Sequence, residues 1–306
     1  METTRPCPVC GCKDARTLFQ PRASPGAVGV CRYCGMMYVH QIDDPRALIV
    51  DGPVLYDGVT PEALISSRLA DVAGSWEFDL LPDREREFPI LRQNASAALA
   101  RVGAHLPHPR ATGGNLLDLG SGWGFFLAAA KEQGWSAYGL DPLPASAVYA
   151  RATFGVPVVT DTLHDDTYPP AFFDVVTAFQ VYEHLPNPGD TTRILHRIIR
   201  PGDVLLIEVP TGDTWTMRLL GRRHRHFVQD HLNFFSYDTL GRMLADRGFT
   251  VCDRYHPTRL MSCEHLAREW LHLGDGVVRL MRRTGIARRP IAMNIGDIIT
   301  VIARRC

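Results

Sequence analysis

Residues 115–124 read Asn-Leu-Leu-Asp-Leu-Gly-Ser-Gly-Trp-Gly. An apolar run ends in an acid, and three glycines follow at alternate positions before a helical pattern begins at Phe125. The apolar run is typical of a parallel strand that is buried on both faces. Alternating glycines let the backbone turn sharply and approach a ligand where a Cβ atom would collide. Because the free N–H groups of the following helix face that turn, the stretch predicts a nucleotide-type cofactor site.

Further strand-length apolar runs follow this turn. They are residues 137–142, 156–161, 173–181 and 204–210. The first of them places Asp141 at its end, where a carboxylate can accept the hydroxyl groups of a ribose. The second ends at Asp161, and the third leads into Glu183-His184. Strands alternating with helical segments predict an α/β fold with a parallel sheet.

In the order and spacing of these motifs, residues 95–210 resemble the class I S-adenosylmethionine-dependent methyltransferases. The resemblance implies a doubly wound, seven-stranded Rossmann-like methyltransferase sheet with one antiparallel strand, and S-adenosylmethionine (SAM) as cofactor. A nicotinamide dinucleotide enzyme would show the fingerprint GxGxxG. Here GxGxG follows an acid, which disfavours that alternative.

The resemblance also implies which residues contact the cofactor. They are Asp118, Gly120, Gly122, Trp123, Phe125, Asp141, Asp161, Leu163 and Gln180. Asp118 and Gln180 would hold the methionyl part, together with the backbone of the glycine turn. Asp141 would accept the ribose hydroxyls, Asp161 would meet the adenine amino group, and Leu163 would pack on the adenine ring.

Cysteines are concentrated near the N-terminus. Two CxxCG motifs supply Cys7, Cys10, Cys31 and Cys34. Paired motifs of this kind are typical of a tetrahedral zinc site with four thiolate ligands, the alternatives being a redox pair or disulfides. Such a closed site leaves no open position for a substrate, so we expect a structural Zn²⁺ in a small zinc-ribbon-like module. Cys12 is either a spare thiol or a register alternative to Cys10.

These features divide the chain into three parts. We expect the zinc-binding module at residues 1–44, a helical linker and lid at 45–110, and the methyltransferase domain at 111–306. In the linker, residues 61–74 and 88–106 show helical spacing, with breaks at Pro82 and Pro89. We also expect the module to have a hydrophobic core separate from that of the methyltransferase domain.

Two segments of the last part depart from regular alternation. Residues 211–235 are rich in arginine, histidine and aromatic residues, and we expect them to form a substrate loop over the reacting methyl group. Residues 260–290 show helical spacing and are expected to be an insertion that adds to the substrate cavity or makes a subunit contact.

An acceptor that must lose a proton needs a base, and histidine suits neutral pH. His231 in the substrate loop and His184 after the third of these apolar runs are the candidates, with Asp230 beside His231 as a second catalytic group. The segment 229–236 resembles that of zinc-binding sugar C-methyltransferases, where an acid–histidine pair performs acid–base chemistry. Those enzymes continue into a further C-terminal domain, whereas this chain stops at Cys306. Related two-part enzymes without that domain also methylate oxygen on small molecules, so the resemblance implies methylation of oxygen or carbon.

Composition narrows the class of partner. The 33 basic and 33 acidic residues cancel, so no overall field attracts nucleic acid, which disfavours an rRNA base methyltransferase. A SAM-binding protein without activity is the other alternative, which three carboxylates at strand ends argue against.

The cluster Arg222-Arg223-His224-Arg225-His226 favours an anionic small-molecule acceptor, although a solvated loop explains it equally well. No membrane-spanning run or signal peptide is evident, so we expect a cytoplasmic protein without a membrane partner.

Overall fold

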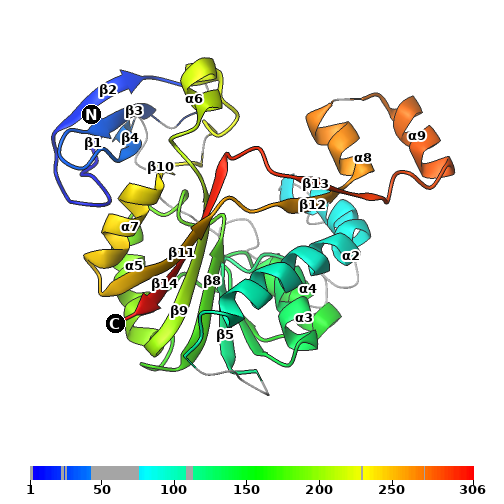
Figure 1. Ribbon diagram of the computed structural model, residues 1–306, viewed down its shortest axis with the longest axis horizontal. Helices are drawn as coiled ribbons and strands as arrows, with labels where there is room; N and C mark the ends of the chain where they lie inside the picture. The colour runs from blue at the N-terminus through cyan, green and yellow to red at the C-terminus, as the bar shows by residue number, and fades with distance from the viewer. Residues whose placement is uncertain are drawn as a thin grey trace.

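The computed structural model describes residues 3–21, 24, 26–42, 76–107, 113–228, 230–271 and 273–306. A seven-stranded sheet with the strand order β11-β14-β9-β8-β5-β6-β7 forms its centre (Figure 1). The strands are β5 (Asn115–Leu119), β6 (Ser136–Leu140), β7 (Val158–Val159), β8 (Phe173–Phe179), β9 (Ile199–Pro210), β11 (Phe249–Tyr255) and β14 (Ile298–Arg305). Strands β5 to β9 pair in parallel, and β14 is antiparallel to both β9 and β11. The expected Rossmann-like sheet with one antiparallel strand is confirmed.

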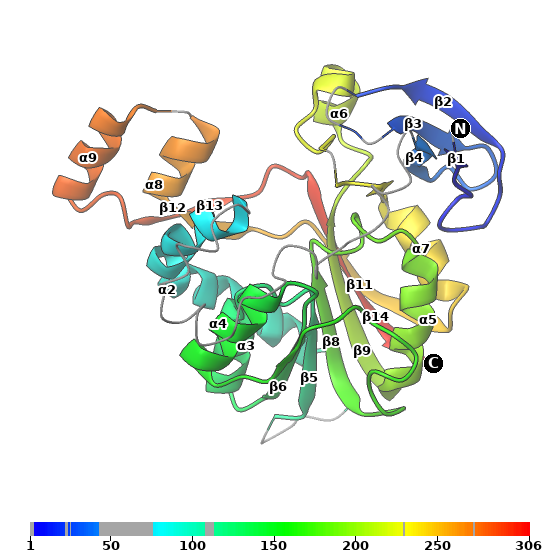
Figure 2. The same cartoon turned by 180° about the vertical axis from the view of Figure 1, so that it is seen from behind.

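Helices cover both faces of this sheet (Figures 1 and 2). One face carries α2 (Trp76–Gly103), α3 (Phe125–Glu132) and α4 (Pro144–Phe154), and the other carries α5 (Pro188–Ile198) and α7 (Tyr237–Ala245). Neighbouring residues of β5 point to opposite faces, so Leu116 packs in the α3 layer and Leu117 in the α7 layer, both fully buried. Both faces therefore need apolar side chains, which explains the continuous apolar run in the sequence.

Helix α2 continues through Pro89, where the sequence predicted a break. A proline inside a helix removes one backbone hydrogen bond and costs about 3 kcal/mol. Burial of Ile90, Leu99 and Val102 along the same helix offsets that cost. The helix expected at residues 61–74 lies outside the described residues.

The N-terminal module is a small antiparallel sheet. Its strands are β1 (Thr3–Thr4), β2 (Ala15–Phe19), β3 (Gly26–Cys31) and β4 (Met37–Ile42), in the order β1-β4-β3-β2. A further strand, β10 (Asn233–Phe234), comes from the expected substrate loop and pairs with β4. The buried guanidinium of Arg5 also donates hydrogen bonds to the Leu232 carbonyl and to the Asn233 side chain.

The module and the large sheet share one hydrophobic core. Met36 and Tyr38 belong to the same buried cluster as Leu117, Ile207 and Phe235. The expectation of a separate core for the module is therefore wrong. A module of this size has too few apolar residues to bury a core alone, so it completes its core against its neighbour.

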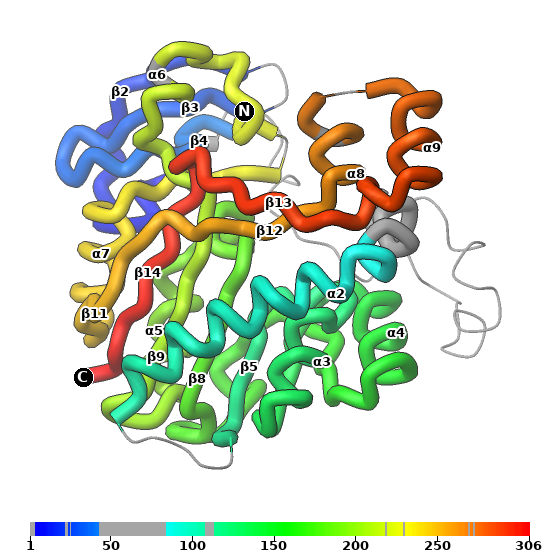
Figure 3. The backbone as a smooth tube through the Cα atoms, turned by 45° about the vertical axis from the view of Figure 1, so that its right-hand side comes forward, coloured from blue at the N-terminus to red at the C-terminus, as the bar shows by residue number. Residues whose placement is uncertain are grey.

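The insertion forms a separate projection beyond α2 (Figure 3). It contains β12 (Arg259–Ser262), α8 (Cys263–His265), the π-helical segment η5 (Leu266–Trp270), α9 (Asp275–Arg283) and β13 (Pro290–Met293), with β12 and β13 paired. The substrate-loop region contains α6 (Trp215–Leu220) and the 3₁₀ turn η4 (Gly221–Arg223) besides β10. Across the described residues, no helix is both long and apolar enough to cross a bilayer.

Candidate functional site

The glycine turn connects β5 to α3 at the point where the strand order reverses. Gly120, Gly122 and Gly124 have φ angles of 70°, 48° and 79°, in the left-handed region that glycine tolerates. A Cβ atom on Gly120 would lie 2.5 Å from Cγ2 of Val181, whereas one on Gly122 would meet nothing within 4 Å. The turn is thus closed toward the protein at Gly120 and open at Gly122, which leaves room for a ligand at the carboxyl ends of the strands.

Asp141 follows β6 and holds the turn in place. Its carboxylate accepts hydrogen bonds from the backbone N–H of Gly122 (2.7 Å) and of Leu143 (2.9 Å), and from the hydroxyl of Ser146 (2.9 Å). Burial raises the pKa of this group above its ordinary value. A carboxylate offers about four acceptor positions, so one remains for a ligand hydroxyl.

Asp118, on β5, is buried beside the turn. The hydroxyl of Thr177 on β8 donates a hydrogen bond to it at 2.7 Å, and burial raises its pKa to about 8. A buried carboxylate with one neutral partner favours a cationic group next to it. The sequence indicated Asp118 but not Thr177, because pairing between strands is not visible in the chain order.

Gln180 directly follows β8 and has a left-handed backbone conformation, with φ 56°. Its backbone N–H donates to the carbonyl of Glu208 at 2.8 Å. Glu208 is a buried carboxylate at the end of β9 that pairs with Arg259 and accepts from Thr300, and the sequence analysis missed it. A non-glycine residue in this backbone region is uncommon and often marks a functional site.

The remaining predicted cofactor residues surround the same edge of the sheet. Trp123 packs edge-on against Tyr149 at a ring-centroid distance of 5.5 Å. Phe125 contacts Phe88 of α2 at 5.4 Å. Two others follow β7: Asp161, which is exposed and accepts a hydrogen bond from the N–H of Thr162, and Leu163, which packs partly buried against the main core.

A second group of side chains lies after β8. Donor atoms of Glu183, His184 and His231 all lie within 4.8 Å of one another. The two imidazole rings meet edge to face with centroids 4.8 Å apart. Asp230 lies beside them, with a carboxylate oxygen 3.4 Å from Nδ1 of His184. The structure thus brings together the three residues that the sequence predicted as catalytic and adds Glu183.

Asp297 anchors the loop that carries His231. It pairs with Arg225 and, at 3.0 Å, with Nε2 of His226. Hydrogen bonds from His226 and Arg225 hold the pKa of Asp297 at about 2 despite its burial. Since Arg225 is neutralised by Asp297 and stacks over Trp270 at 4.3 Å, it serves loop structure and does not present a free charge.

The four cysteines of the two CxxCG motifs meet in one place. Their sulfur atoms all lie within 4.8 Å of one another, with Cys7 3.4 Å from Cys34 and Cys10 3.6 Å from Cys31. Zinc–sulfur bonds of about 2.3 Å in a tetrahedron would separate sulfurs by about 3.8 Å. The donor set therefore fits Zn²⁺, while Cys12 is outside the group.

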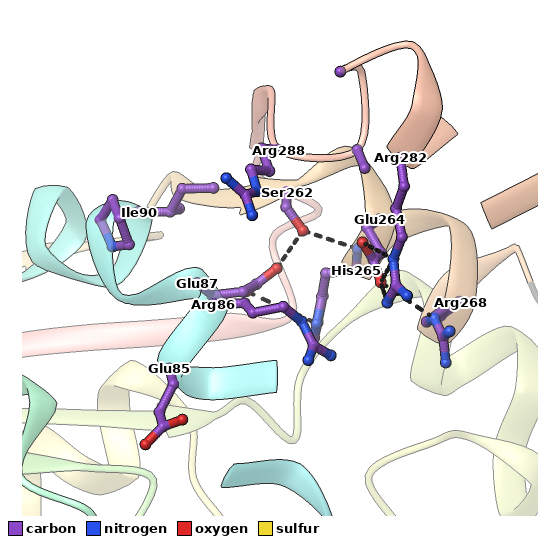
Figure 4. Close-up of a pocket in the computed structure, with 13 residues that line it drawn as sticks. Glu85, Arg86, Glu87, Ile90, Ser262, Glu264, His265, Arg268, Arg282 and Arg288 are labelled. Atoms are coloured by element: carbon purple, nitrogen blue, oxygen red, sulfur yellow. Dashed lines mark hydrogen bonds and ion pairs between the residues drawn. The ribbon is translucent and has the colours of Figure 1, made fainter. Parts of the chain in front are cut away.

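A cavity of about 740 Å³ lies between α2 and the insertion (Figure 4). Its charged lining comprises Arg86, Arg268, Arg282, Arg288, Glu85, Glu87, Glu264 and His265. Figure 4 shows Glu87 pointing to Ser262, with which it forms a hydrogen bond, and Arg282 pairing with Glu264. Glu85 also accepts a hydrogen bond from Tyr149, the residue against which Trp123 packs, so Tyr149 links one lining residue of the cavity to the glycine turn.

Comparison with known proteins agrees with this geometry. The methyltransferase domain family matches residues 90–253. The chain is 33% identical over 160 residues to the ubiquinone biosynthesis O-methyltransferase of Pseudomonas aeruginosa (strain LESB58), and 28% identical over 160 residues to the protein of that name from Pseudomonas paraeruginosa (strain DSM 24068 / PA7). Each alignment covers 46% of this chain and 66% of the relative.

The fold is also similar to that of a solved structure. A chain from the complex between the Haloferax volcanii Trm112 methyltransferase activator and a methyltransferase superposes with a TM-score of 0.51 at 18% identity. The superposition covers 75% of this chain and 96% of that one. At this identity the similarity concerns the fold alone.

Proposed function

This chain belongs to the methyltransferase domain family and is a SAM-dependent methyltransferase, and we propose that it methylates an oxygen or carbon atom of a small molecule. The observation that carries the proposal is the position of the Glu183, His184 and His231 group. Glu183 and His184 follow β8 closely, as Gln180 does, and His231 lies against them, which supports acid–base side chains next to the predicted cofactor crevice. The relatives named O-methyltransferases favour a hydroxyl acceptor.

When bound, SAM supplies a methyl group already activated for transfer. The protein then has to position the acceptor, exclude water and accept a proton. We propose that Asp118 and Gln180 hold the methionyl part, that Asp141 binds the ribose, and that Asp161 and Leu163 meet the adenine. The glycine turn, with Trp123 and Phe125 beside it, closes the cofactor site on the α3 side.

We propose that the acceptor proton leaves through the group formed by His184, Asp230 and His231. Burial and the neighbouring His184 lower the pKa of His231 to about 4, so its imidazole is neutral at pH 7 and one ring nitrogen keeps its lone pair. The exposed arginines Arg222 and Arg223 are the part of the arginine-rich cluster that can still attract an anionic acceptor. Nucleic acid and membranes are not part of this proposal, and cytoplasmic location stays a prediction.

We also propose that the N-terminal module binds one structural Zn²⁺. We assign it to Cys7, Cys10, Cys31 and Cys34, whose four thiolates leave no position for a substrate. Its effect on catalysis would be indirect, because β4 pairs with β10 next to His231.

A labelled-methyl screen tests the proposed function. The full-length protein is incubated with SAM carrying an isotopic methyl group and a panel of phenols, sugar nucleotides and carboxylated alcohols. We expect label in at least one small molecule, and mass spectrometry then locates it on oxygen or carbon. Label found only in ribosomal RNA would instead support the base-methyltransferase alternative. SAM binding without transfer to any acceptor, RNA included, would indicate an inactive binding protein.

A further inference from the structure

Glu183 is a buried acidic residue whose carboxyl group is unpaired within the described part of the chain. Its side chain is 1% exposed, and neither carboxylate oxygen has a hydrogen-bond partner among the described residues. Burying an unpaired polar group costs several kcal/mol, and a charged one costs more. Buried carboxylates in proteins are normally paired with a cation or coordinate a metal. Among the described residues, no group hydrogen-bonds to the carboxyl oxygens of Glu183, and burial raises its pKa to about 8. A cation bound beside it would stabilise the charged form of this group.

The two histidines next to Glu183 are held in one tautomer. Nδ1 of His184 lies 3.0 Å from the backbone carbonyl of Asp230, and Nδ1 of His231 lies 2.9 Å from that of His226. A carbonyl oxygen can only accept, so both Nδ1 atoms donate, and in each neutral ring the lone pair is on Nε2. Fixing a ligand histidine through a hydrogen bond from its other nitrogen is the usual arrangement in metal sites.

We propose that Glu183, His184 and His231 bind a divalent transition-metal cation. Two imidazoles and one carboxylate within 4.8 Å of one another form a ligand set typical of catalytic zinc and non-haem iron sites. This set differs in kind from the four thiolates of the N-terminal module, because three ligands leave coordination positions open. The cation also provides the positive partner for Glu183.

The anchoring of the loop supports a site that is formed in advance. Asp297 holds Nε2 of His226, and the carbonyl of the same His226 accepts from His231. The backbone N–H groups of Leu232 and Asn233 donate to the carbonyl of Glu183 at 2.7 and 3.0 Å. The loop that carries His231 is thus fixed against the segment that carries Glu183, so little reorganisation is needed for metal binding.

The catalytic consequence of this site rests on the proposed function, although the binding does not. A cation at an open site lowers the pKa of a hydroxyl bound to it. As the O–CH₃ bond forms and the S–CH₃ bond of SAM breaks, the hydroxyl proton would pass to Asp230, which is exposed and adjacent to His184. In the metal-bound enzyme His231 is a ligand, and Asp230 is the base.

Metal retention by the full-length protein tests the site directly. Protein whose four-cysteine site is loaded with zinc is dialysed against Co²⁺ and then analysed for both metals. We expect one cobalt per chain in addition to one zinc, with visible absorption that lacks the charge-transfer bands of cobalt–thiolate bonds. Glu183→Gln and His231→Asn should each weaken cobalt binding at least tenfold.

A matched control comes from His256. Its Nδ1 also donates to a backbone carbonyl, that of Ile298 at 2.8 Å, but it lies outside the cluster. His256→Asn should bind cobalt like the wild type. Thermal unfolding and SAM affinity of each variant show whether it is folded.

Two results would overturn the metal site. One is wild-type protein with zinc but no further metal, and the other is folded Glu183→Gln protein that retains cobalt with unchanged affinity. Cobalt retention combined with a failed acceptor screen would leave the metal site standing and refute the proposed function. A successful acceptor screen with protein that retains no cobalt would refute the metal site and leave the proposed function standing.

Discussion

At Gly120 two separate restrictions act on one residue. Its φ of 70° disfavours any L-residue, and a Cβ atom there would lie 2.5 Å from Cγ2 of Val181. Gly202 has a φ of 83° but nothing within 4 Å of its would-be Cβ, so it carries only the first restriction. The two positions therefore separate backbone strain from steric exclusion.

Alanine substitutions at these glycines should have unequal effects. Gly202→Ala should lower the free energy of unfolding by about 1–2 kcal/mol, the cost of a left-handed L-residue. Gly120→Ala should lower it by about 1–3 kcal/mol more, because Val181 must move, and should abolish SAM binding. Chemical denaturation and calorimetry measure the two effects. Equal destabilisation by the two variants would show that the space around Gly120 is not restricted.

Asp118 should make SAM affinity depend on pH. Its pKa is raised to about 8, so the carboxyl group is mostly protonated at neutral pH before ligand binds. The ammonium group of the methionyl part would lower that pKa, so binding is coupled to proton release. We expect affinity to rise with pH, by up to about tenfold per pH unit, and to level off above about pH 8. Calorimetry across this range tests it, and the slope should disappear in Asp118→Asn.

The residue scale is also where the sequence was most informative. Motifs predicted Asp118 and Asp141 as cofactor residues, because a cofactor of this kind binds at the carboxyl ends of the strands, where both residues lie. Their partners Thr177 and Ser146, and the buried Glu208, could not be predicted, since they depend on which strands and helices become neighbours. Glu183 was visible as half of a Glu-His pair, but only the structure shows that its carboxyl group has no hydrogen-bond partner among the residues it describes.

Among the elements, the β12–β13 hairpin is hydrogen-bonded to α2 through Asn94 as well as Glu87. Asn94 donates to the carbonyl of Leu260 and accepts from its N–H, both at 2.8 Å. The amide thus acts as an additional strand partner for the hairpin. Helical spacing in residues 260–290 correctly predicted α9, but nothing in the sequence indicated that α2 would hold the hairpin.

Asn94→Leu should loosen this hairpin, although the hydrogen bond between Glu87 and Ser262 is kept. The loss of two hydrogen bonds should lower the free energy of unfolding by about 1–3 kcal/mol and remove amide-exchange protection from β12 and β13. SAM affinity should stay close to wild type, because the glycine turn does not contact the hairpin through Asn94. Gln93→Leu is the control, since Gln93 is exposed on the same helix and, within the part of the chain that the structure describes, its side chain bonds only to the Pro89 carbonyl. Full protection of β12 in Asn94→Leu would contradict the role assigned to Asn94.

Over the whole molecule, the N-terminal module and the methyltransferase sheet are joined by a common core, and we expect them to unfold together. They share a buried cluster, and β10, which begins two residues after His231, adds a strand to the module's sheet. The cysteine pattern correctly predicted that Cys7, Cys10, Cys31 and Cys34 come together in space, and that they bind zinc stays a prediction. The cysteine pattern could not predict the shared core. The module has few apolar residues, and their order in the chain does not show which other element they pack against.

Loss of zinc should therefore disturb the acceptor side of the enzyme. Cys31→Ser removes one ligand, and we expect amide protection to fall together in β3, β4 and residues 230–235, since Phe234 pairs with Met37. SAM affinity should change little, because the cofactor residues follow β5, β6 and β8, away from the module. Cys12→Ser, outside the four-sulfur group, is the control and should keep its zinc and its protection. If residues 230–235 stay protected while β3 and β4 exchange freely in Cys31→Ser, the module is energetically independent and zinc cannot act on the acceptor loop.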